Sequence, residues 1–132
     1  MSACGSKTNT EVTITDAWVR NNAPGQTIGA AYMTLNSPIK NTLVYAEAID
    51  AAGSVEIHSM TMQNGVMKMR MLEELMLEPN QSVSLKPGDF HLMLFDLKAP
   101  LEIGNNITFR LCFKDANGNI TEQMVSAPVK DI

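Results

Sequence analysis

From Glu11 onward the chain alternates between short β-prone runs and clusters of turn residues, and this alternation constrains its fold most strongly. The clusters are rich in glycine, asparagine and proline, which adopt positive φ or fix φ as tight turns require. No long segment has the apolar periodicity of a helix. About eight short strands joined by such turns predict an all-β fold, for which an antiparallel Greek-key sandwich or barrel is the economical arrangement. We expect strands at residues 12–19, 28–35, 43–49, 55–62, 66–72, 83–85, 90–97, 107–113 and 120–125.

The 132 residues are enough for one hydrophobic core, and no repeat or linker divides residues 11–132 into smaller domains. Residues 1–10 are small and polar, so we expect them to form a disordered tail. Within this tail, Ser2-Ala3-Cys4-Gly5 resembles the end of a bacterial lipoprotein signal, in which the cysteine is lipidated. That resemblance implies a protein in the periplasm or on the outside of the cytoplasmic membrane, anchored through Cys4. The alternative is that this is the natural N-terminus of a cytosolic protein and that Cys4 has no role.

The charge and hydropathy patterns exclude two classes of partner. The formal net charge is −4 and the lysines and arginines form no cluster, so we expect no nucleic-acid binding. No apolar run approaches the length of a membrane-spanning helix, about 18 residues. We therefore expect membrane association only through a lipid anchor at Cys4.

The run at residues 107–113 allows its two faces to be assigned. Ile107, Phe109, Leu111 and Phe113 alternate along it, so these side chains should point into the core. Cys112 then lies on the polar face and should be partly exposed. Because no other cysteine or histidine is near it in sequence, we interpret Cys112 as a surface residue without a chemical role.

Methionine occurs ten times although aromatic residues make up only 5% of the chain, so the surplus does not reflect general hydrophobicity. Both histidines and most of the methionines lie between His58 and Met93. This coincidence makes the segment the candidate site.

Asn64-Gly65 between two β runs is the strongest short hairpin signal, because a type I′ turn needs positive φ at both central residues. With these two residues as the loop, Met62 pairs with Met67 and Met60 with Met69. The next pair on that face joins His58 to Met71, so one face carries a histidine and five thioethers. The opposite face should be exposed to solvent, and it carries Ile57, Ser59, Thr61, Lys68 and Arg70.

The second histidine also has a methionine on its own face, because His91 and Met93 are two residues apart in a strand. His58, Met69, His91 and Met93 together would supply two imidazoles and two thioethers. Neutral, soft thioethers favour Cu(I) over hard ions, and zinc sites usually use thiolate, imidazole or carboxylate. The alternative is that the methionines are core fillers, since one face of a sandwich hairpin is normally buried.

The spacing of these four residues resembles the H-x₁₀-M-x₂₁-H-x-M signature of the PCu(A)C copper chaperones of the bacterial cell envelope. The resemblance extends over residues 11–129, including the segments at 16–20, 30–33, 55–58, 65–70, 85–88 and 90–94. It implies a cupredoxin-like Greek-key fold with His58, Met69, His91 and Met93 as Cu(I) ligands. It also implies delivery of Cu(I) to an acceptor such as the binuclear copper centre of cytochrome c oxidase. The additional methionines depart from the family pattern and leave room for a substitute ligand or a second weak site.

Three other functions remain as alternatives. A copper-storage or resistance protein would bind several Cu(I) ions, and a structural sandwich would bind none. An electron-transfer cupredoxin is disfavoured because blue-copper sites need a cysteine, and neither cysteine lies in the candidate segment. No nucleophile–base pair stands out in the sequence, so we expect no enzymatic turnover.

Overall fold

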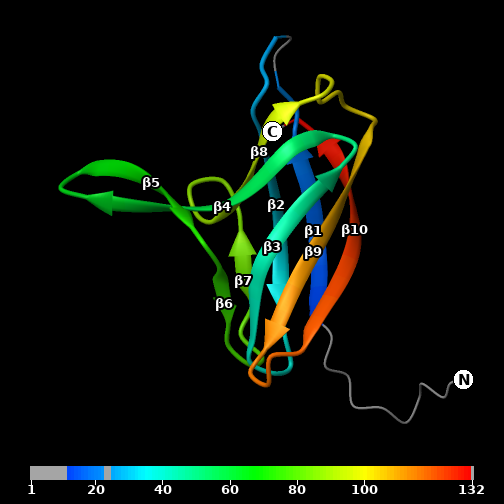
Figure 1. Ribbon diagram of the computed structural model, residues 1–132. Helices are drawn as coiled ribbons and strands as arrows, with labels where there is room; N and C mark the ends of the chain where they lie inside the picture. The colour runs from blue at the N-terminus through cyan, green and yellow to red at the C-terminus, as the bar shows by residue number, and fades with distance from the viewer. Residues whose placement is uncertain (1–11, 23–24, 132) are drawn as a thin grey trace, which may run out of the picture.

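The computed structural model describes residues 12–22 and 25–131, and these residues form ten strands without a helix (Figure 1). The predicted tail with Cys4 lies outside the described residues. Among those residues there is accordingly no apolar helix of the length that a membrane crossing needs. The strands are β1 (Thr13–Arg20), β2 (Gly29–Asn36), β3 (Asn41–Ile49), β4 (Ala52–Gln63), β5 (Val66–Leu72), β6 (Leu75–Leu77), β7 (Val83–Leu85), β8 (His91–Leu97), β9 (Asn106–Asp115) and β10 (Ile120–Lys130).

The predicted all-β fold is confirmed, and each predicted strand is present with slightly different ends. The prediction missed β6, because its three residues are too few to show an alternating pattern. β6 pairs with the first residues of β3 and covers one edge of the sandwich.

Hydrogen-bonded neighbours follow the order β5-β4-β8-β2-β1-β10-β9-β3-β6, with β7 paired to β2. Two layers result, and β1 and β10 join them through the pairs Val19–Val129 and Arg20–Lys130. This junction is parallel, whereas the other pairs of named strands in the described residues are antiparallel, as predicted. Strands joined by a tight turn must run antiparallel, whereas β1 and β10 come from opposite ends of the chain and no short connection sets their direction.

The core lies between the two layers. Leu92 and Leu94 of β8 face Phe109, Leu111 and Phe113 of β9 across a cluster in which all five side chains are fully buried. The predicted inward face of β9 is thus confirmed, with Ile107 packed at its margin. Cys112 lies on the other face and is partly exposed, as predicted.

The β4–β5 hairpin leaves the body of the sandwich, as Figure 1 shows. Its register is the predicted one, with Met62 opposite Met67 and Met60 opposite Met69. Every residue from 61 to 71 is exposed, so the interpretation of the hairpin methionines as core fillers is wrong. The first half of β4 still lies over the core, which buries Ile57 and Ser59 and corrects the prediction that their face is solvent-exposed.

Candidate metal centre

The two histidines lie side by side on neighbouring strands. β4 and β8 pair antiparallel with His58 directly opposite His91, and the centroids of the two imidazole rings are 5.5 Å apart. Both side chains are largely buried, with 9% of His58 and 5% of His91 exposed. Two imidazoles so close can bind the same metal ion.

The ring of His91 is oriented by the backbone. Its Nδ1–H donates a hydrogen bond to the carbonyl oxygen of Asp89 at 3.2 Å. Because a carbonyl oxygen only accepts, the proton is on Nδ1 and Nε2 keeps its lone pair. Burial lowers the pKa of His91, the hydrogen bond to Asp89 raises it, and neighbouring His58 lowers it further, with a net decrease. His91 is therefore neutral at neutral pH, which is the protonation state that binds metals.

The ring of His58 is oriented by a carboxylate from its own strand. Nε2 of His58 lies 2.9 Å from Oε1 of Glu56, and an ionised carboxylate can only accept this hydrogen bond. In the neutral imidazole Nδ1 is then the nitrogen with a lone pair, and this atom is buried without a hydrogen-bond partner among the described residues. Buried polar atoms are normally paired, so an unpartnered imidazole nitrogen beside a second imidazole fits a metal ligand.

The two predicted methionine ligands lie on either side of His58. Met93 is opposite Glu56 on β8, which makes it a diagonal neighbour of His58, and it is half-buried. Met69 is opposite Met60 on β5, and it is the other diagonal neighbour of His58. Met71 lies directly opposite His58, and both β5 methionines are about half exposed. All four predicted ligands therefore occupy one face of three adjacent strands.

Several residues around the histidines were not identified from the sequence as parts of the site. The ring of Phe95 lies 6.1 Å from that of His58, and the ring of Tyr32 lies 6.4 Å from that of His91. The ring of Trp18 on β1 packs against that of Tyr32, with 4.7 Å between the ring centroids, so Trp18 continues the row of rings that begins at the histidines. Glu56 was also missed, although its position two residues before His58 places both side chains on one strand face.

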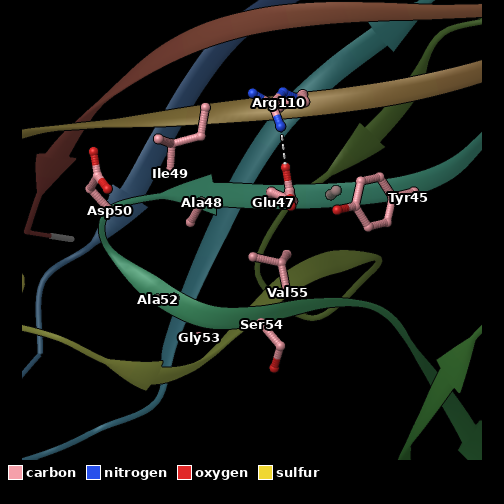
Figure 2. A pocket seen from close by; sticks show the side chains of 11 residues that line it. Tyr45, Glu47, Ala48, Ile49, Asp50, Ala52, Gly53, Ser54, Val55 and Arg110 are labelled. Atoms are coloured by element: carbon pink, nitrogen blue, oxygen red, sulfur yellow. Dashed lines mark hydrogen bonds and ion pairs between the residues drawn. The ribbon is translucent and has the colours of Figure 1, made fainter.

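A well-formed pocket lies away from the histidines. It has a volume of about 390 Å³ between β3 and β4 and contains the ion pair between Glu47 and Arg110, whose closest atoms are 2.7 Å apart (Figure 2). Neither histidine lines this pocket. In the described part of the chain, no group of three or more His, Cys, Asp or Glu side chains is arranged to hold a metal. The predicted thioethers are the candidates for further protein ligands to a metal at the histidine pair.

Comparisons with known proteins identify the family and the fold of this chain. Residues 12–129 match the family described as "Putative lipoprotein LpqE-like". A protein of Leifsonia xyli subsp. xyli named "Putative lipoprotein" is 32% identical over 126 residues, which cover 91% of this chain and 70% of the relative.

Two solved structures share the fold. The apo PCuAC domain from PmoF1 has a TM-score of 0.72 at 21% identity, and the match covers 95% of this chain and 98% of that domain. The solution structure of the Cu(I) form of DR1885 from Deinococcus radiodurans has a TM-score of 0.67 at 28% identity. That match covers 97% of this chain and 83% of the Deinococcus protein. The predicted similarity to PCu(A)C proteins is confirmed, and the chain belongs to the LpqE-like lipoprotein family, with the fold of a PCuAC domain.

Proposed function

We propose that this protein is an extracytoplasmic copper chaperone, which binds one Cu(I) tightly through His58, Met69, His91 and Met93 and passes it to an acceptor protein. The observation that carries the proposal is the adjacent histidine pair, in which each ring has a nitrogen free of its proton. The buried Nδ1 of His58 has no hydrogen-bond partner among the described residues, and a bound metal ion would occupy this position. The Deinococcus protein, whose structure was solved in its Cu(I) form, supports the choice of ion.

The donor set suits an ion that must be released again. Two imidazoles and two thioethers are neutral, so the positive charge of Cu(I) is left uncompensated. An acceptor with thiolate ligands can therefore take the ion by stepwise exchange, and the copper centre of a cytochrome c oxidase subunit is an acceptor of this kind. Met69, with half of its surface exposed, would be the first ligand accessible to such a partner.

The proposed location follows from the tail and from the relatives. Residues 1–10 would connect a lipid anchor at Cys4 to the copper-binding domain of residues 11–132. This arrangement is supported by the lipoprotein names of the family and of the Leifsonia relative. It would hold the domain at the outer surface of the cytoplasmic membrane.

The proposal is tested by anaerobic competition between the protein and a Cu(I) chelator, with Zn²⁺ as the competing ion. One Cu(I) should bind, an excess of Zn²⁺ should not displace it, and Met93→Leu should weaken binding sharply because leucine keeps the volume but lacks sulfur. Met124→Leu is the matched control, since Met124 is an exposed methionine on β10. Displacement of Cu(I) by equimolar Zn²⁺, or equal binding by both variants, would contradict the proposal.

A copper-storage or resistance protein is the second candidate, and the exposed methionines of the hairpin favour it. A store would hold several Cu(I) ions with similar affinities, whereas a chaperone would hold one ion much more tightly than any other. The number of Cu(I) ions retained against a strong chelator separates the two. The metal-free sandwich is less well supported, because it gives no reason for the unpartnered Nδ1 of His58.

A further inference from the structure

The outer part of the β4–β5 hairpin exposes thioethers that neither the core nor the histidine centre explains. Met62 is 63% exposed and Met67 is 45% exposed, and they lie opposite each other next to the turn. Met33, by contrast, is a true core methionine with 1% exposed. Large apolar side chains on a projecting hairpin gain nothing from folding, so their gathering on one face needs another explanation.

The hairpin brings these thioethers close together. Asn64 and Gly65 have φ values of 52° and 79°, as a type I′ turn requires, and Gln63 pairs with Val66 across it. This first pair is hydrogen-bonded, so the next one, Met62–Met67, is a non-hydrogen-bonded pair. In such pairs the Cα atoms are only about 4.5 Å apart and the side chains are closest. Met60 and Met69 form a second pair of the same kind, two residues further from the turn on each strand.

We propose that Met60, Met62 and Met67 form a second, weaker site for a soft monovalent ion, Cu(I) or its redox-stable analogue Ag(I). Three rotatable bonds allow each side chain to turn its sulfur toward a shared ion. Thioethers are the ligands that select such ions from harder ones.

The second site would be distinct from the histidine centre. Met62 is four residues from His58 along β4, which corresponds to about 13 Å at the rise of a strand. One ion cannot reach both ends of that span. The proposal therefore does not depend on the proposed function, although Met60–Met69 would give an ion a route between the two sites.

The surroundings explain why this site would bind weakly. Its three ligands are neutral and two of them lie open to water. The opposite face of the hairpin carries Lys68 and Arg70, both exposed, whose positive charges disfavour a cation nearby. Weak binding with fast exchange is the behaviour expected of an entry or exit site.

The test is a titration of the full chain with Ag(I), followed by NMR of ¹³C-labelled methionine methyl groups. The first equivalent should shift the signals of Met69 and Met93, and a second equivalent should shift those of Met60, Met62 and Met67. The double variant Met62→Leu/Met67→Leu should lose the second equivalent and keep the first. Leucine preserves volume at exposed positions, so the variant should fold normally.

Exposed methionines outside the hairpin provide matched controls. Met76 and Met124 are 50% and 56% exposed, and their replacement by leucine should leave both equivalents bound. Met93→Leu should impair the first equivalent while the hairpin signals still shift, so the failure of one site is distinguishable from the failure of the other. The proposal is overturned if no second equivalent binds, or if the Met76→Leu and Met62→Leu/Met67→Leu chains lose it equally. Absence of binding would favour contact of this face with a partner protein.

Discussion

Glu56 and Met71 are two residues near the histidine pair that lie outside the predicted copper-binding motif. Glu56 holds Nε2 of His58, so it determines which ring nitrogen is left for a metal. Met71 is directly opposite His58, whereas the motif residue Met69 is a diagonal neighbour. Both observations lead to predictions about single side chains.

Replacing Glu56 by glutamine should weaken Cu(I) binding by about tenfold to a hundredfold, the range typical of residues that orient metal-binding histidines. An amide can donate to Nε2 as well as accept from it, so the ring is no longer held in one tautomer. Chelator competition measures the change. Glu47→Gln, which disturbs the Arg110 ion pair in a pocket that neither histidine lines, should have no effect on Cu(I). Equal effects of the two variants would assign Glu56 a general structural role.

Comparison of Met69→Leu with Met71→Leu identifies the β5 ligand. Each substitution preserves volume, so the stability of the fold should change by less than about 1.5 kcal/mol. We expect a large loss of Cu(I) affinity for Met69→Leu and a small one for Met71→Leu. The reverse order would show that the methionine opposite His58 is the ligand, and that the motif spacing misidentifies it.

At the scale of single elements, hydrogen bonds to one side chain stabilise the turn that connects β9 to β10. In the loop between β9 and β10, Oδ1 of Asp115 accepts hydrogen bonds from the backbone N–H groups of Asn117 and Asn119, each at 2.9 Å. Oδ2 accepts a third hydrogen bond from the Asn119 side chain at 3.2 Å. The backbone N–H of Asn119 contributes most to lowering the pKa of Asp115, so its ionised form stabilises the loop.

This loop should make the stability of the protein depend on pH. A carboxyl whose pKa is lower in the folded state stabilises the fold above its unfolded pKa, and loses that effect as pH falls through the folded pKa. Asp115→Asn should therefore lower the melting temperature at neutral pH, and the difference from the parent should shrink on acidification. Thermal unfolding at a series of pH values measures this. A difference that stayed constant into strongly acidic solution would show that the charge of Asp115 is unimportant.

Across the whole molecule, core packing and the proposed metal site occupy opposite faces of the same strands. Leu92 and Leu94 of β8 face the core, while His91 and Met93 of the same strand lie on the outer face. The sandwich thus positions the proposed ligands outside the hydrophobic core between the two layers. The two functions should be separable by mutation.

Leu92→Ala should destabilise the protein by about 2–5 kcal/mol, because it leaves a cavity at a fully buried position. The Cu(I) affinity of the folded protein should change little. Met93→Leu should do the opposite, with stability retained and affinity lost. Chemical denaturation and chelator competition on both variants test this. A parallel loss of both properties in Leu92→Ala would mean that core packing positions the ligands directly.

Local patterns in the sequence were sufficient for several features that depend on neighbouring residues along the chain. The Asn64-Gly65 turn determined the hairpin register, and period-two alternation placed Phe109 in the core and His91 beside Met93. Alternation requires no knowledge of other strands, because successive side chains of any strand point to opposite faces. The prediction of His58, Met69, His91 and Met93 as ligands used the same alternation together with the family resemblance.

Only the tertiary structure decided which strands became neighbours. The pairing of β4 with β8 places His58 opposite His91, although 32 residues separate them in the chain, from 59 to 90. The burial of Ile57, the exposure of Met62 and the parallel junction of β1 with β10 depend equally on where the rest of the chain packs. Such contacts result from the burial of one shared core by the entire chain, and no short stretch of sequence contains that information.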